Sequence, residues 1–392
     1  MIGYSRQQKC LATVAICAAG YGAYSDSVVY PIASTIAADF PGITSGAINL
    51  FLTGASAIAA VIAAVLAGFL VKWIHKRTLI VLGTIFFLVG GVASFWAEDF
   101  SFLIAMRALD GFSDGLIATT VAAMITQVFP DEAERARVFS LHIVAALVFS
   151  IITGSLSGVL CRYGWRYSFL ANSASVVSVL LAVLFLPDTP LEPKHPPQGQ
   201  KQPWNPGIPL GAIVMYMLLS ALAFVCSICS SFYVTENNLG GSALVGFSQS
   251  AGKIICLVIT LSFSWIYARF KTYIPVVSCL SFSLIYFLLY RLGSPMTLFL
   301  AMGILNIGMS LIPTYFELKV SEHTPEYSMG LMMGLYSVSV YGGNLLCPYV
   351  PTTLQKVLGL SNYTQTYLPI ALILSGITLF YLAQLLLFRK KS

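Results

Sequence analysis

Long apolar runs constrain what this chain can fold into more than any other feature. Each run has about 20 or more mostly apolar residues, the length that an α-helix needs to cross the hydrocarbon core of a bilayer. Only helices and closed barrels satisfy their backbone polar groups in lipid, and these runs are too long and continuous for barrel strands. The sequence therefore predicts an all-α membrane protein with twelve transmembrane helices. Their expected limits are 11–32, 46–71, 78–96, 100–128, 138–161, 168–187, 208–232, 243–267, 273–290, 297–318, 329–350 and 366–388.

The composition favours a membrane protein over a soluble enzyme. Hydrophobic residues make up 57% of the chain and charged residues 9%, whereas soluble domains carry about 25% charged residues. The eight cysteines show no metal-binding or disulfide spacing, so we interpret them as small core residues. The sequence also lacks a G-x-x-x-x-G-K-[ST] nucleotide loop, a catalytic triad and a metal motif. We expect no enzymatic activity, no cofactor and no nucleic-acid partner.

The distribution of lysine and arginine predicts the orientation in the membrane. The first apolar run follows a polar start and is too long for the core of a signal peptide, so we expect a first membrane helix rather than a cleavable signal. With the N-terminus inside, the cytoplasmic segments carry 15 Lys and Arg residues and the outer loops carry 4. We therefore expect a multi-pass protein with both termini in the cytoplasm. Its compact loops are typical of a bacterial inner-membrane protein.

A polar segment rich in proline and glutamine divides the chain. Such a segment disfavours helix, so we expect an N-terminal six-helix half over residues 1–187, a cytoplasmic linker over 188–207 and a C-terminal six-helix half over 208–392. A faint direct repeat supports this division. Residues 105–110 align with 301–306 at an offset of 196, and an alignment near residue 68 has an offset of 194. Near-equal offsets are typical of parallel repeats in twelve-helix transporters.

Four segments of the first half carry recognisable motifs. Residues 68–77 (GFLVKWIHKR) are similar to a G-x-x-x-D-x-x-G-R-R loop, 107–113 (RALDGFS) to R-x-x-Q-G-x-G, and 154–158 (GSLSG) to G-P-x-x-G. Residues 164–169 (GWRYSF) resemble a common connection between the fifth and sixth helices. Lysine replaces the acid of the first motif, and serine replaces the proline of the third. Together they resemble the major facilitator superfamily over essentially the whole chain, closest to its drug:proton antiporter branch.

Charged residues inside the spans are the main candidates for function. A charge at the bilayer centre costs at least ~2.5–3.5 kcal/mol on insertion scales. Arg107, Asp110 and Asp114 lie at i, i+3 and i+7 and share one helix face. The resemblance implies that the first, fourth, seventh and tenth spans line a central cavity. A charged face on the fourth span agrees with that arrangement.

The depth of these charges predicts a pair between two helices. Asp26 lies ~9 Å below the outer end of the first span, and Arg107 ~10 Å below the outer end of the fourth. We expect Asp26 and Arg107 to pair, and protonation of Asp26 or Asp110 to release the pair. A nearby cation favours a charged carboxylate whereas desolvation disfavours it, so alternating exposure can couple a proton to a conformational change. The alternative is that Arg107 and Asp110 satisfy each other within one helix. Asp114 completes the predicted proton-coupling set.

A lysine of the eighth span and several polar and aromatic residues of the cavity helices form a predicted substrate site. Lys253 lies ~15 Å into the eighth span, where it could attract an anionic substrate, pair with an acid or extend its ammonium to a polar neighbour. An apolar pocket with a few polar groups suits an amphiphilic ligand. The predicted substrate-binding residues are Lys253, Tyr24, Tyr30, Phe224, Asn306 and Tyr315.

Small and basic residues form a predicted gating set. Glycines allow helices to approach closely and slide, although ordinary tight packing is a sufficient alternative. The basic pair after the second span is expected to hold the inner gate or lipid headgroups, and it also contributes to topology. The predicted gating residues are Gly68, Lys76, Arg77, Gly154 and Gly158.

These features predict a proton-coupled secondary transporter that exports a small organic or amphiphilic molecule by alternating access. The alternative is a proton symporter that imports a small metabolite or an organic anion. A membrane sensor or scaffold is disfavoured, because it need not carry the insertion cost of buried charges. The expected partners are a small-molecule substrate, protons and the lipid bilayer, and a monomer is the expected state.

Overall fold

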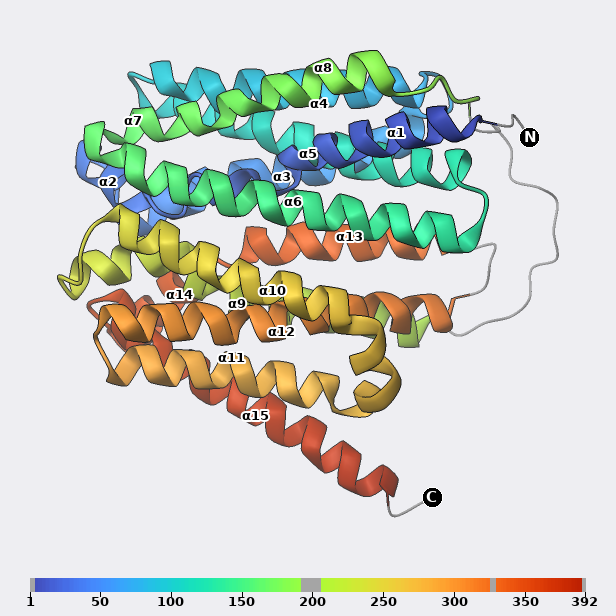
Figure 1. The fold of residues 1–392 in the computed structure, drawn as a ribbon. Helices are drawn as coiled ribbons and strands as arrows, with labels where there is room; N and C mark the ends of the chain where they lie inside the picture. Colours follow the sequence, from blue (N-terminus) through green and yellow to red (C-terminus); the bar gives the residue numbers. More distant parts are fainter. Residues whose placement is uncertain (1–3, 192–205, 325–328, 390–392) are drawn as a thin grey trace. The chain divides into compact units, whose positions relative to one another are not determined.

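The structure is a computed structural model that describes residues 4–191, 206–324 and 329–389 (Figure 1). Within these residues every regular element is an α-helix or a 3₁₀-helix, which confirms the predicted all-α fold. Ten helices of the described part are long and apolar enough to cross a membrane. Most of the predicted linker, residues 188–207, lies outside the described residues.

The chain divides into two compact units. The first unit contains the described residues of 1–40 and 51–198. The second unit contains those of 41–50 and 199–392. The exact domain bounds expected from the sequence stay a prediction. The helices of the first unit are α1 (Arg6–Ala19), α2 (Ala33–Asp39), α3 (Ser45–Leu70), α4 (Lys76–Ala93), α5 (Phe100–Val128), α6 (Glu132–Leu160), α7 (Trp165–Ser168) and α8 (Ser175–Phe185). Its 3₁₀-helices are η1 (Gly20–Ser27), η2 (Ser94–Trp96), η3 (Cys161–Tyr163) and η4 (Phe169–Ala174).

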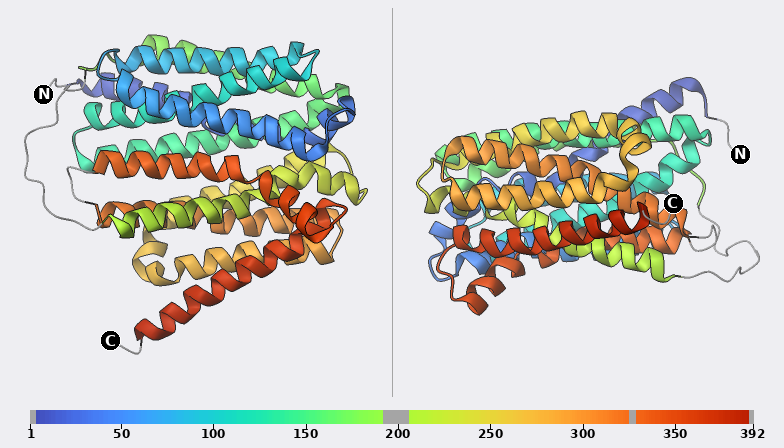
Figure 2. Two further views of the ribbon diagram at one scale, coloured as in Figure 1. Left: turned by 180° about the vertical axis from the view of Figure 1, so that it is seen from behind. Right: turned by 90° about the horizontal axis from the view of Figure 1, so that it is seen from below.

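The second unit contains eight elements among its described residues. They are α9 (Gly207–Glu236), α10 (Ser242–Phe270), η5 (Lys271–Tyr273), α11 (Ile274–Arg291), α12 (Pro295–Glu322), α13 (Met329–Leu346), α14 (Tyr349–Leu358) and α15 (Tyr363–Arg389). Figure 2 shows α15 running past the other helices of this unit towards the C-terminus, and α15 contacts α11 most extensively.

The first predicted span is not one continuous α-helix. It begins at a capping box, in which the Ser5 hydroxyl accepts from the Gln8 N–H and the Gln8 side chain accepts from the Ser5 N–H. The α-helix then ends at Ala19, and the 3₁₀-helix η1 starts at Gly20, so the span predicted over 11–32 consists of more than one helical segment. Glycine has a low helix propensity, and Gly20 and Gly22 both lie in this stretch. The change of helix type occurs just before Asp26.

Contacts between helices stabilise the interrupted segment. Nδ1 of His142 on α6 lies 2.8 Å from the carbonyl oxygen of Ile16, close to the end of α1. A Cβ at Gly20 would lie 3.1 Å from the same imidazole ring, so a larger residue would press on it. The Tyr21 hydroxyl donates to the carbonyl oxygen of Ala171 at 2.8 Å. The position of η1 is therefore set by α6 and η4 and not by η1 alone.

Two side-chain contacts organise the second unit. The Tyr286 hydroxyl of α11 donates to the carbonyl oxygen of Leu222 at 2.5 Å and accepts from the Cys226 N–H at 2.9 Å, so it is inserted into the backbone ladder of α9. Such an insertion is one of the known causes of a helix bend. At the end of α9, the Glu236 carboxylate accepts the N–H groups of Tyr363 and Thr364 at 2.9 and 3.2 Å. Glu236 therefore caps the first turn of α15.

Candidate functional site

A buried arginine in α5 joins three helical segments of the first unit. The Arg107 side chain is 1% exposed, and its two terminal nitrogens form ion pairs with Asp26 and with Asp110. Its Nε donates to the carbonyl oxygen of Leu52 on α3 at 3.4 Å. All three nitrogens of the guanidinium thus have partners, and the fork of donors connects η1, α5 and α3.

The local sequence explains how this arrangement forms. Arg107 and Asp110 are three residues apart on α5 and therefore neighbours on one face of that helix. Asp26 comes from η1, which packs against α5. The predicted pair between Asp26 and Arg107 is present, and so is the alternative pair within the helix. Arg107 makes both contacts at once, and the Tyr30 hydroxyl adds a donor to Asp26 at 3.4 Å.

Asp114 completes a cluster with more acids than bases. It is half-buried on α5 and interacts electrostatically with Asp26, Asp110 and Arg107. We call these four residues the Arg107 cluster. Its net charge is −2 when all three carboxyl groups are ionised, because three negative charges face one positive charge. A second oxygen of Asp110, Oδ1, is buried without a hydrogen-bond partner among the described residues. Uncompensated buried charge is unfavourable, so this cluster suits reversible protonation.

Backbone packing holds α5 and α3 at the depth of the cluster. A Cβ at Gly111 would lie 2.0 Å from the carbonyl oxygen of Ser56, and a Cβ at Gly115 would lie 2.0 Å from that of Ala60. Arg107, Gly111 and Gly115 follow one another every four residues and so form one stripe on α5. This is the small-xxx-small pattern that lets membrane helices approach closely. Gly111 and Gly115 were not predicted from the sequence to have this role, although their spacing of four residues indicates it.

The predicted substrate residues are divided between the two units. Tyr30 is half-buried beside the Arg107 cluster, and the side chain of Tyr24 lies outside the described residues. In the second unit, Phe224 on α9, Lys253 on α10 and Tyr315 on α12 are each half-buried. Their membership of one binding site stays a prediction.

Asn306 is occupied by its own helix. Its side-chain nitrogen donates to the carbonyl oxygen of Met302 at 2.8 Å, one turn earlier on α12. A Cβ at Gly252 of α10 would lie 2.5 Å from the same nitrogen, so the amide lies in a tight contact between α10 and α12. Asn306 therefore packs between helices in the second unit, and a contact between Asn306 and substrate stays a prediction.

The basic residues of the predicted gating set lie at the start of α4. Lys76 is 1% exposed. Nη2 of Arg77 donates to the carbonyl oxygen of Val183 at 2.7 Å, and Nη1 lies 3.5 Å from the Asp188 carboxylate. The Tyr4 hydroxyl donates to the carbonyl oxygen of Asp188 at 3.0 Å. The N-terminal segment and the chain after α8 thus meet near the start of α4. Asp188 was not predicted from the sequence to take part in these contacts.

The glycines of the gating set have different surroundings. Gly154 and Gly158 are buried on α6. Gly68 is exposed on α3, and a Cβ there would meet nothing within 4 Å. The structure therefore shows no close helix approach at Gly68 among the described residues, and the gating roles of all three stay predictions. The described residues also contain no group of three or more His, Cys, Asp or Glu that could hold a metal ion.

Comparison with known proteins identifies a transporter family. A family model described as "Major Facilitator Superfamily" matches residues 14–348. The chain is 23% identical to "Myo-inositol transporter 2" of Schizosaccharomyces pombe over 43% of this chain and 30% of that protein. It is 26% identical to "Sugar transport protein 2" of Arabidopsis thaliana over 34% of this chain and 27% of that protein. Human "Sialin" is 27% identical over 40% of this chain and 37% of that protein. The matches span about a third of these relatives' lengths.

Solved structures share the fold at low sequence identity. A peptide transporter POT in complex with sulfate has a TM-score of 0.76 at 14% identity, over 96% of this chain and 94% of that chain. The nucleoside transporter NupG has a TM-score of 0.72 at 14% identity, over 96% of this chain and 98% of that chain. At such identity these likenesses establish the common fold only.

Proposed function

The chain belongs to the Major Facilitator Superfamily and is a membrane transporter, and on that premise we propose that it couples the movement of a small organic solute to protons. One observation supports this proposal above all others. Arg107, which is 1% exposed, is shared between the carboxylates of Asp26 and Asp110 within the membrane-spanning part of the first unit. A transporter without ion coupling has no need for this excess of buried acid.

The two acids paired with Arg107 differ in accessibility. The side chain of Asp26 is 19% exposed and that of Asp110 is 1% exposed. We assign proton exchange with water to Asp26, because a proton must reach the group from solvent. A protonated Asp26 no longer attracts Arg107 as an ion, whereas Arg107 keeps Asp110 as its partner. Protonation therefore weakens the connection between η1 and α5 while leaving the connection within α5 in place.

This weakening gives a route from proton binding to conformational change. The connection of η1 to α5 depends on the Asp26–Arg107 pair, and α5 also carries Asp110 and Asp114 on the same face. Binding of a proton changes the free-energy difference between two conformations of the transporter by as much as the proton's binding free energies for those conformations differ. In a rocking mechanism, the solute and the proton then bias the same transition and their binding is reciprocally linked.

The direction of transport is a separate part of the proposal. Export is favoured by residues 154–158, which resemble an antiporter motif with Ser155 in place of proline. A hydroxyl-rich solute is favoured by two of the named relatives, a myo-inositol transporter and a sugar transport protein, which match 43% and 34% of this chain. We propose import of a small hydroxyl-rich solute with protons as the leading function, because Ser155 leaves the antiporter motif incomplete and the similarity to those relatives favours such a solute. Export of an amphiphilic molecule in exchange for protons is the alternative.

Proteoliposomes with a pH-sensitive dye inside test coupling and direction together. Myo-inositol, glucose and the amphiphilic cation ethidium are supplied in turn to the parent and to Asp26→Asn. We expect one solute to drive proton movement in the parent, with a loss of at least about tenfold in the variant, whereas exchange of labelled solute continues. Inward co-movement of solute and protons indicates symport, and opposite movement indicates antiport.

A matched variant controls for the loss of an acid elsewhere. Asp99 caps α5 by accepting the Phe102 N–H at 2.7 Å, and asparagine caps helices equally well. Asp99→Asn should therefore retain proton movement. Solute uptake that is equal in the parent and in Asp26→Asn, without proton movement in either, would show that Asp26 is structural and that the transporter is uncoupled from protons.

A further inference from the structure

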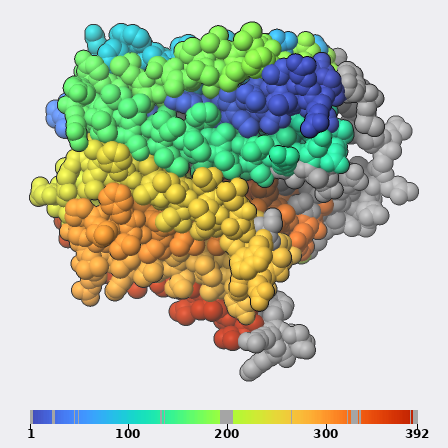
Figure 3. Space-filling model, in the orientation of Figure 1, coloured from blue at the N-terminus to red at the C-terminus, as the bar shows by residue number. Residues whose placement is uncertain are grey.

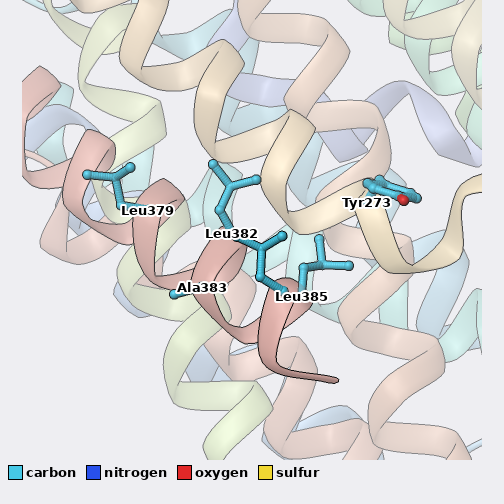
Figure 4. A pocket seen from close by; sticks show the side chains of 6 residues that line it. Tyr273, Leu379, Leu382, Ala383 and Leu385 are labelled. Atoms are coloured by element: carbon cyan, nitrogen blue, oxygen red, sulfur yellow. The ribbon is translucent and has the colours of Figure 1, made fainter. Parts of the chain in front are cut away.

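An apolar crevice lies between the start of α11 and the C-terminal half of α15 (Figure 4). Its volume is about 420 Å³, within the range of small-molecule pockets. Five of the six lining residues come from one helix, and the sixth adds a phenol from η5. The lining residues are Tyr273, Leu379, Leu382, Ala383, Leu385 and Leu386.

The crevice opens away from the helices of its unit. Leu379 is 66% exposed and Leu386 is 65% exposed, although both line the crevice. They lie at i and i+7 with Leu382 at i+3, so the leucines form one stripe along α15. In the space-filling view the C-terminal part of α15 stands out from the rest of its unit (Figure 3). On a helix long and apolar enough to cross a membrane, an exposed leucine stripe matches lipid acyl chains in polarity.

The crevice lies near the C-terminal end of the hydrophobic run of α15. The lining extends to Leu386, and in the sequence the apolar run continues to Phe388 and is followed by Arg389. Tyr273 lies at the start of α11, and the rings of Trp265 and Phe270 pack 6.1 Å apart just before it. Aromatic residues are enriched at the boundary between hydrocarbon and headgroups. The leucine stripe therefore extends from this boundary into the hydrocarbon for ~10 Å, less than half of the ~30 Å core.

Two cationic residues precede Tyr273 closely in the chain. Lys271 of η5 pairs with Glu322 at 2.8 Å, so those two charges compensate each other. Arg269 is exposed in the last turn of α10, four residues before Tyr273, and forms no ion pair within the described part of the chain. The distribution of Lys and Arg places this segment on the predicted cytoplasmic face. A cation beside an apolar crevice at the headgroup level is complementary to an anionic lipid.

We propose that this crevice binds the upper part of one acyl chain of an anionic phospholipid, with Arg269 contacting the phosphate-bearing headgroup. The leucines and the alanine exclude water from the chain, and the Tyr273 hydroxyl is available to the ester region. Each group of the site thus faces the part of the lipid that it matches in polarity. The site is independent of the Arg107 cluster, which belongs to the other unit.

Native mass spectrometry of the purified full-length protein tests the site. The protein is mixed with phosphatidylglycerol or with phosphatidylcholine that carries the same acyl chains. One cation near the headgroup is worth about 1 kcal/mol, so we expect phosphatidylglycerol to be retained roughly fivefold better. Arg269→Gln should abolish this preference. Ala383→Trp, which fills the crevice at an exposed position, should lower retention of both lipids.

Two further variants control for charge and bulk. Arg291→Gln removes an exposed arginine at the opposite end of α11, and Leu372→Trp adds bulk at a position of α15 that is 64% exposed and outside the crevice. Both should bind lipid as the parent does. Equal retention of the two lipids by the parent, or unchanged retention in Ala383→Trp, overturns the proposal. So does a change of oligomeric mass in Ala383→Trp without a change in lipid retention, since the crevice would then accommodate a second copy of the chain. Leu386→Ala repeats the test if the tryptophan variant does not fold, and reduced retention is again expected.

Discussion

Replacing Gly111 by alanine would place a methyl group where α5 and α3 approach most closely. The new Cβ would lie 2.0 Å from the carbonyl oxygen of Ser56 and 2.5 Å from its carbonyl carbon and Cα. An ordinary contact begins at 3.4 Å, so the two helices must separate by about 1.4 Å at this point. The obstructing atoms are backbone atoms of a helix, which cannot move aside as a flexible side chain does.

The size of the effect follows from two opposing contributions. Overpacking of this kind costs about 1–3 kcal/mol, and alanine in place of glycine in a helix recovers up to about 1 kcal/mol. Separation of the helices also draws the carbonyl of Leu52 away from Arg107 Nε, a contact that is already 3.4 Å long. Loss of that hydrogen bond costs about 1 kcal/mol and offsets the gain in helix propensity, so we expect Gly111→Ala to lower the free energy of unfolding by about 1–3 kcal/mol.

Thermal unfolding of the purified protein in detergent, followed by helical circular dichroism, measures this change. The midpoint should fall by about 1–4 °C, because the entropy of unfolding of a chain of 392 residues is about 0.8 kcal/mol/K. The matched control is Gly376→Ala on α15, where a Cβ would meet nothing within 4 Å and the midpoint should stay the same or rise. If Gly111→Ala unfolds at the temperature of the parent, the close approach of α5 and α3 does not exist as described, and the reasoning fails.

Three further changes test other contacts. Tyr286→Phe removes the hydroxyl that accepts the Cys226 N–H of α9, so the free energy of unfolding should fall by about 1 kcal/mol. An unchanged midpoint of thermal unfolding would mean that α9 forms its own backbone hydrogen bond there at no cost. Glu236→Ala removes the cap of α15 and should cost about 1 kcal/mol, with faster amide exchange in the first turn of α15 as the specific readout. The hydrogen bond from Lys271 lowers the pKa of Glu322, so this contact stabilises the fold above about pH 5 and the effect is lost as the pH falls through the lowered value. Glu322→Gln should therefore be less stable than the parent by less than about 1 kcal/mol at pH 7, and this difference should vanish once the pH is below the lowered pKa of Glu322. A difference that persists in acid would exclude an ionic origin.

Much of the membrane fold and part of the candidate site followed from the sequence. Runs of apolar residues determine the spans, because lipid tolerates only segments that satisfy their own backbone. The constant rise of a helix converts sequence position into depth, and for this reason Asp26 and Arg107 were expected to meet. The spacing of Arg107 and Asp110 likewise placed both on one face of α5.

Other features depended on contacts between segments that are distant in the chain. The change from α1 to η1 is supported by His142 and Ala171, which lie more than a hundred residues away. From the sequence, Arg107 was expected to pair either with Asp26 on another helix or with Asp110 on its own helix. Both pairs are present, because a guanidinium has enough donors for two carboxylates. Asp188 meets Arg77 only because loops from different helices converge.

Sequence alone therefore determined which segments enter the membrane and at what depth their charges lie, since both are properties of a single helix. Tertiary structure decided which helix faces touch, how closely Gly111 approaches Ser56 and where a crevice remains open between α11 and α15. These features depend on the rotation and separation of neighbouring helices. Many combinations of rotation and separation bury the same residues, and only the complete set of side-chain contacts selects one of them.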